Sequence, residues 1–243
     1  MTHFADVTEP TACLVPPAEP EEFLDPMKPL NDVAELLSPS GWLFKLAELY
    51  LPKDPVKWAK ESFAGDWEAY ARCVSAWQAT GRACDGVARN LRSGSARIDV
   101  TWDGNAAGAA ALYFAALAGN LVDFRTALDA MGVEYLAIAQ AVSAAGEAVG
   151  DCLGAIVDAL IALALAAAVE AASGGTAAVA AAALGTEELL TILREWERMV
   201  RCVAAVQALV HAGHGTLVRL GTEALAGLNA FPLPGASYDH PAV

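Results

Sequence analysis

The chain has 243 residues, of which 56% are hydrophobic and 18% are charged, and its formal net charge at pH 7 is −14. So acidic a chain repels phosphate backbones, which argues against nucleic-acid binding, and it lacks the basic face that holds a helix on anionic lipid.

The cysteines argue against a disulfide framework and against a zinc site, because none of them shows paired spacing such as Cys-x-x-Cys. We expect most of them to be small buried hydrophobic residues. They are Cys13, Cys73, Cys84, Cys152 and Cys202. The first 22 residues have neither a basic start nor a continuous apolar core, so the sequence predicts that any export avoids the general secretory route.

The two ends of the chain are predicted to be disordered tails. Residues 1–28 are rich in proline and acidic residues and offer too little apolar surface to offset the entropy of ordering. Two short helices are expected within residues 29–53, at 31–37 and 41–51. Residues 230–243 form the second tail, after a proline-containing stop.

Three long helices are predicted between residues 54 and 229. Asp54-Pro55 is a good start for the first, which should run to Leu91 and stop at Ser93-Gly94. The second should run from residue 106 to about 172, and the last should begin at Thr186, where two glutamates suit the positive helix end. Each carries an uncharged stripe with alternating steps of three and four, as in a helix that packs lengthwise on a partner.

These stripes and the lack of any strand-like alternation predict an all-α protein. The simplest arrangement is an elongated antiparallel bundle of three long helices, with the short N-terminal helices packed on it. The second helix is longer than the first. Its far end should therefore pair mainly with the last helix or with another molecule.

Two turns stand out in this bundle. Trp102, Asp103 and Gly104 lie at the corner between the first and second long helices, where glycine eases the turn and tryptophan can cover the apolar end. Ser173, Gly174 and Gly175 form the tip of an apolar hairpin, residues 152–184. This hairpin is either a buried pair of small-residue helices or a pair that enters a bilayer, although its uncharged runs are shorter than a full span.

The sequence offers no catalytic constellation and no cofactor motif, so we expect a protein that is not an enzyme. His211 and His214 are three residues apart, a spacing that can share a metal ion, but no third ligand accompanies them. We expect no metal site and interpret both as surface or packing histidines.

The corner resembles that of the WXG family, helical-hairpin proteins exported by type VII (ESX-type) secretion in actinobacteria and related bacteria. The likeness covers about residues 54–140 and rests on Trp102-Asp103-Gly104, the long flanking helices and the missing signal peptide. The chain departs from the family in its N-terminal extension and third long helix. The family's Tyr-x-x-x-Asp/Glu export signal normally follows the second helix, whereas the match here, Tyr50 to Asp54, precedes the first.

The resemblance implies a non-catalytic secretion substrate, effector leader or partner. Such a protein would be secreted, or cytoplasmic before export, and would bind another helical protein and the secretion machinery. Two alternatives remain: a pore-forming or translocation helper that uses the 152–184 hairpin, and a structural subunit of a larger assembly.

Overall fold

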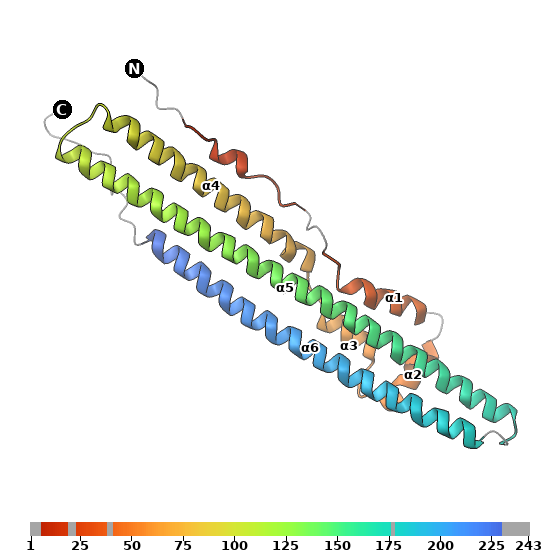
Figure 1. Cartoon of the computed structure of the whole chain (residues 1–243). Coiled ribbons are helices and arrows are strands. Elements are labelled where there is room, and N and C mark those ends of the chain that lie inside the picture. Colours follow the sequence, from red (N-terminus) through yellow and green to blue (C-terminus); the bar gives the residue numbers. More distant parts are fainter. Residues whose placement is uncertain (1–5, 19–22, 38–40, 176–177, 230–243) are drawn as a thin grey trace. The chain divides into compact units, whose positions relative to one another are not determined.

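The computed structural model describes residues 6–18, 23–37, 41–175 and 178–229. Within these ranges it contains only helices, in the order η1 (Pro10–Cys13), α1 (Met27–Leu37), α2 (Gly41–Tyr50), α3 (Pro55–Ser62), α4 (Trp67–Asp99), α5 (Asn105–Ala172) and α6 (Ala178–Asn229) (Figure 1). Long helices pack against each other, so the predicted all-α bundle is confirmed. The predicted tail at 230–243 lies outside the described residues.

The internal contacts fall into two compact units, each of which draws on several helices. Unit 1 comprises residues 1–19, 72–136 and 213–243, and unit 2 comprises residues 20–71 and 137–212.

Unit 1 is built around the antiparallel pairing of α4 with α5. A Cβ placed on Gly132 of α5 would lie 3.6 Å from the carbonyl oxygen of Val74, and one on Gly81 of α4 would lie 3.3 Å from the Arg125 side chain. The rings of Trp77 and Tyr135 meet between the same helices, with centroids 6.1 Å apart. Residue 74 of α4 thus lies near residue 132 of α5, and residue 81 lies near residue 125, as expected of two antiparallel helices.

Unit 2 pairs the distal part of α5 with α6, also antiparallel. The Cys202 thiol of α6 lies 3.9 Å from the carbonyl oxygen of Ala145, and Gly185 faces Leu163 further along. The predicted stripe of α5 is buried here, as expected of a lengthwise contact, and so is that of α6. The buried members are Ile138, Val142, Ala145, Val149, Cys152 and Ile156 on α5, and Ile192, Met199, Val203 and Val206 on α6.

The short helices complete unit 2. Asp54 begins α3 as predicted, since its carboxylate accepts hydrogen bonds from the backbone N–H groups of Val56 and Lys57 at 2.9 and 3.0 Å. The ring of Trp58 on α3 meets that of Trp196 on α6, with centroids 5.2 Å apart.

The first long helix is interrupted, contrary to prediction. α3 ends at Ser62 and α4 begins at Trp67, because Phe63 closes one helix and the Asp66 carboxylate caps the next through the N–H of Ala69. The indole of Trp67 also donates to the carbonyl oxygen of Phe63 at 2.9 Å. The spacing of the apolar residues carried no sign of this break.

Two helix ends also differ from the prediction. α4 continues through Ser93-Gly94 to Asp99; Gly94 is buried, and one helical glycine costs only about 1 kcal/mol. The last helix begins at Ala178, eight residues before the expected Thr186, because the alanine-rich stretch in front of Thr186 is itself a strong helix former.

Part of the segment expected to be a disordered tail lies against the helices. Residues 6–18 run beside α4, and residues 23–30 lie on α5, where Pro26 and Leu30 are buried (Figure 1). Glycines make this possible. A Cβ on Gly146 would lie 2.6 Å from the Cα of Pro26, and one on Gly150 would lie 2.7 Å from the Cβ of Pro29.

Candidate functional site

The α4–α5 corner is formed as the sequence predicts, with glycine in a conformation that other residues rarely adopt. The N–H groups of Thr101 and Trp102 both donate to the carbonyl oxygen of Ile98 at 3.0 Å, which ends α4. Gly104 has φ +99°, and the N–H of Gly108 donates to its carbonyl oxygen to start α5.

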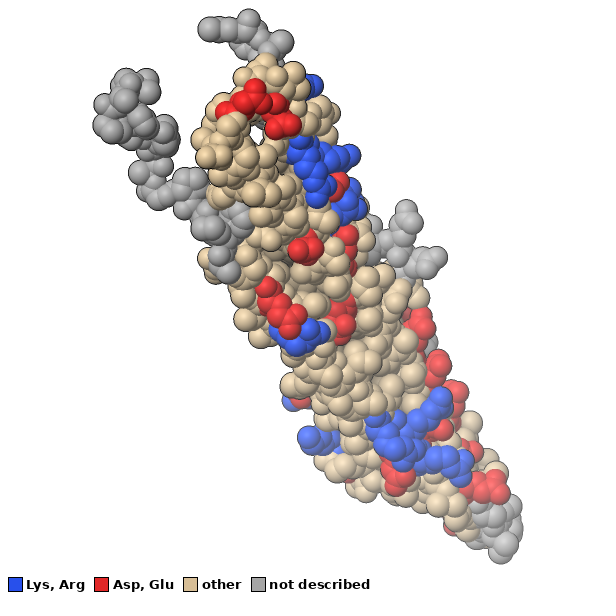
Figure 2. Space-filling model, turned by 60° about the vertical axis from the view of Figure 1, so that its left-hand side comes forward, with Lys and Arg blue, Asp and Glu red and all other residues tan. Residues whose placement is uncertain are grey.

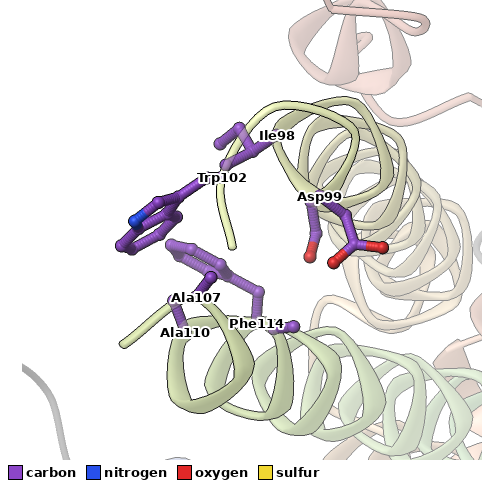
Figure 3. A pocket seen from close by; sticks show the side chains of 8 residues that line it. Ile98, Asp99, Trp102, Ala107, Ala110 and Phe114 are labelled. Carbon is purple, nitrogen blue, oxygen red and sulfur yellow. The ribbon is translucent and has the colours of Figure 1, made fainter. Parts of the chain in front are cut away.

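The tryptophan of the corner is less buried than expected of an internal plug. Its side chain is 43% exposed, and it lines a shallow groove with Ile98, Ala107, Ala110 and Phe114 (Figure 3). The Asp99 carboxylate lies at the edge of the same groove. The cavity itself is only about 10 Å³, which is room for about one water molecule.

Other apolar residues close to the corner in the sequence are exposed to solvent. Val100 and Leu112 are 82% and 75% exposed, and Ile98 is also exposed. Exposed apolar residues near an aromatic side chain are typical of a surface that binds another protein. The corner can therefore dock an apolar surface.

The tip of the distal hairpin is also formed as predicted, up to the last described residue before the gap at 176–177. Gly174 and Gly175 have φ +62° and +91°, and the Ser173 hydroxyl donates to the carbonyl oxygen of Glu170 at 2.9 Å. Both conformations favour glycine.

The two arms of this hairpin expose much of their apolar surface. Ile161, Leu165 and Val169 of α5 are 41%, 62% and 57% exposed, and Leu184 of α6 is 53% exposed. Figure 2 shows that wide parts of one face of the molecule carry neither acidic nor basic residues.

Among the described helices, α5 alone is long and apolar enough to cross a membrane, by length and composition. An 18-residue window in it has a mean hydropathy of 2.4, and 33% of that window is buried. A core helix of a soluble protein passes the same test.

Among the described residues, His211, His214 and the cysteines form no recognisable metal site. His211 is exposed, and its Nδ1 lies 2.7 Å from the carbonyl oxygen of Gln207, one turn earlier on the same helix. In the described part of the chain no group of three His, Cys, Asp or Glu side chains could hold a metal ion.

Cys152 is the most strongly perturbed thiol. It is 1% exposed; burial, followed by a hydrogen bond with the Glu195 carboxylate, raises its pKa to about 11. Burial also raises the pKa of Cys84 and Cys202. Thiols held protonated in this way are poor nucleophiles and suit packing.

A polar contact that the sequence analysis did not single out lies on α4. Asn90 is 8% exposed and forms hydrogen bonds with the backbone of residues 7 and 8. The sequence shows only that Gly86 and Asn90 are one turn apart; the burial that obliges the amide to find a partner is seen in the structure alone.

No family model, curated protein or solved structure matches this chain.

Proposed function

We propose that the chain is a non-catalytic, WXG-like helical-hairpin protein of type VII secretion, which acts by docking on another helical protein. One observation carries the proposal: Trp102-Asp103-Gly104 forms the turn between α4 and α5, with Gly104 at positive φ and Trp102 partly exposed. The exposed apolar surface of Trp102 and Ile98, which line the same groove, supports a docking role.

The proposal favours export in company with a partner. The Tyr-x-x-x-Asp match ends at Asp54, whose carboxylate is engaged as the N-cap of α3. The partner would then supply the export signal. The chain is expected in the cytoplasm before export and outside the cell afterwards.

Secretion by this route can be tested in the native host by deleting the type VII ATPase. We expect the extracellular level of the chain to fall and its intracellular level to rise. Equal extracellular levels with and without the ATPase would rule out export by that system.

The docking role can be tested separately by co-purification from the host. Trp102→Ala should reduce recovery of the partner helical protein, whereas Val133→Ala, which alters an exposed apolar residue elsewhere on α5, should not. Equal recovery with both variants, each with native helicity by circular dichroism, would show that the corner is not the docking surface. Recovery of the chain only as a defined multiple of 25.2 kDa would favour a structural subunit.

The exposed apolar arms of the 152–184 hairpin favour a second candidate, a protein that inserts into membranes. Only Asp158 and Glu170 lie among the apolar residues on the first arm, so acidic pH should favour insertion. Leakage of a dye from neutral phospholipid vesicles at pH 5 and pH 7.5 tests this role. Leakage that Leu165→Glu abolishes would support it, and the absence of leakage at both pH values would exclude it.

A further inference from the structure

Helices α1 and α3 cover one side of the α5–α6 pair in unit 2. Pro29 of α1 packs on Gly150 of α5, where an added Cβ would lie 2.7 Å from the proline Cβ. Trp58 of α3 packs on Trp196 of α6, with ring centroids 5.2 Å apart. Because α1 and α3 also contact each other, the two short helices lie on the same side of the pair.

The side of the pair away from α1 and α3 is exposed. Asp151, Asp158 and Leu165 are one heptad apart, so they form a row on α5. On α6, Leu184 and Arg194 are turned by more than 90° from the position that meets α3, since successive helical residues differ by about 100°. All five residues are exposed, and together they are called the open face.

The charged residues of the open face lack partners within the chain. No described residue forms an ion pair with Asp151, Asp158 or Arg194. The next two arginines along α6 differ, because Arg198 and Arg201 each pair with a glutamate of the same helix at 3.4 Å. The open face therefore offers two free acidic groups on α5 and one free basic group on α6.

The register of α5 and α6 follows from two contacts. The Cys202 thiol lies 3.9 Å from the carbonyl oxygen of Ala145, and the Leu163 side chain lies 3.6 Å from a Cβ placed on Gly185. Residues 153–154 of α5 are thus level with residue 194 of α6, and residue 164 is level with residue 184. The arginine of the open face therefore lies at a height between its two aspartates, and its two leucines lie at almost the same height.

A surface that carries both halves of such a match at one height can pair with a copy of itself. We propose that the open face is the interface of a homodimer whose twofold axis runs parallel to α5 and α6. This axis places α5 of one copy on α6 of the other at the same height, so that Arg194 meets Asp151 and Asp158 and leucine meets leucine. A twofold axis perpendicular to the helices would instead place α5 on α5, and aspartates on aspartates or on leucine.

The area on offer suits a stable dimer. From residue 148 to residue 169, α5 is about 33 Å long, and two helices side by side are about 20 Å wide. Each copy thus presents about 700 Å², close to the roughly 800 Å² per partner of a standard interface. Ala148, Ala155 and Ala162 lie between the row on α5 and the contact with α6, and their small side chains let a second copy approach closely.

This inference goes beyond the proposed function and does not depend on it. The open face belongs to unit 2, whereas the corner that carries the proposed function belongs to unit 1. It also lies outside residues 54–140, on which the resemblance to the WXG family rests.

The test uses the purified full chain in about 0.15 M NaCl, which screens the repulsion due to the net charge of −14 beyond about 8 Å. We expect the mass from light scattering to approach twice 25.2 kDa as the concentration rises from about 1 to 100 μM. Arg194→Glu should raise the Kd of the dimer about tenfold or more, because it sets like charges against each other twice in each dimer. Arg219→Glu, the same charge change at an exposed arginine of α6 in unit 1, is the control and should leave the Kd unchanged.

A mixture of two variants tests the arrangement itself. Asp151→Arg/Asp158→Arg should weaken the dimer as Arg194→Glu does. An equimolar mixture of the two variants should form heterodimers with a Kd near that of the wild type, because each α5–α6 contact again joins opposite charges. A wild-type chain that stays monomeric at about 100 μM, or equal Kd values for Arg194→Glu and Arg219→Glu, would overturn the proposal. A mixture that associates no more tightly than either variant alone would rule out the parallel twofold axis.

Discussion

Gly104 and Trp102 differ in how the corner depends on them. Gly104 has φ +99°, and no heavy atom lies within 4 Å of where its Cβ would be, so its substitution meets backbone strain and no steric clash. Trp102, in contrast, is 43% exposed and contributes through the part of its side chain that lines the groove. The two residues therefore stabilise the turn by separate mechanisms.

Both contributions can be measured by chemical denaturation. We expect Gly104→Ala to lower the free energy of unfolding by about 1–2 kcal/mol, because a left-handed backbone is unfavourable for an L residue. Trp102→Ala should cost about 1–2 kcal/mol, less than the 3–5 kcal/mol typical of a fully buried aromatic residue. Gly108→Ala in the first turns of α5 is the control and should be neutral or slightly stabilising. A loss above 4 kcal/mol for Trp102→Ala would mean that the ring is buried in solution.

Cys152 gives unit 2 a sensitivity to alkaline pH. Its pKa is raised from 9.0 to about 11, so between these values the folded state keeps a proton that the unfolded state loses. Stability contributed by the protonated thiol is then complete below pH 9 and falls as pH rises toward 11.

The pH effect of Cys152 can be isolated by comparing the wild type with Cys152→Ala. We expect the free energy of unfolding of the wild type to fall by of order 1 kcal/mol more than that of the variant between pH 8.5 and 10.5. Cys84 shifts in the same direction and is present in both proteins, so its contribution cancels in the difference, whereas that of Cys202, which interacts with Cys152, cancels only in part. Parallel pH profiles would show that Cys152 titrates alike in both states.

At the scale of the elements, Gly146 and Gly154 of α5 are a matched pair. Both are helical and differ in what faces them: Pro26 would lie 2.6 Å from a Cβ on Gly146, whereas nothing lies within 4 Å of one on Gly154. Alanine raises helix propensity at either position. Any difference between the two substitutions in the free energy of unfolding therefore comes from the segment docked on Gly146.

The expected effects have opposite signs. Gly146→Ala should displace residues 23–30 and lower the free energy of unfolding by about 1–3 kcal/mol, despite the gain in propensity. Gly154→Ala should raise it by about 0.5–1 kcal/mol. Hydrogen exchange at the backbone N–H of Lys28, which donates to Asp25, reports on the segment directly and should accelerate only in Gly146→Ala. Equal exchange in both variants would show that Pro26 does not rest on Gly146.

The elements also show what the sequence could and could not reveal. The stripes of α5 and α6 and both glycine turns were predictable, because each follows from local periodicity or from a backbone conformation that needs glycine. The break between α3 and α4 at Gly65-Asp66 was missed because the spacing of apolar residues gives no information on hydrogen bonds that cap a helix end. The docking of residues 6–18 was missed because composition describes a segment alone, while its contacts on Asn90 and Gly86 lie 76 to 83 residues further along the chain.

For the whole chain, repulsion among like charges should outweigh the visible ion pairs. The net charge is −14, and the pairs Arg89–Asp85, Arg201–Glu197 and Arg219–Glu223 join residues one helical turn apart, all of them exposed except Asp85, which is 21% exposed. Such pairs contribute about 0.3–0.5 kcal/mol each. Arg125–Asp85 does link α4 to α5 at 3.2 Å, but Arg125 is 39% exposed.

Salt should therefore stabilise the chain. Raising NaCl from 0.01 to 0.3 M shortens the screening length from about 30 Å to below 8 Å, which weakens long-range repulsion among the 29 acidic residues more than contacts within 4 Å. We expect Tm at pH 7.5 to rise by a few degrees, and this rise to shrink near pH 4.6, where the net charge approaches zero. Scanning calorimetry at both pH values checks this, with sucrose of equal osmolality as the control for excluded-solute effects. A fall in Tm with salt at pH 7.5 would mean that the ion pairs matter more than the net charge.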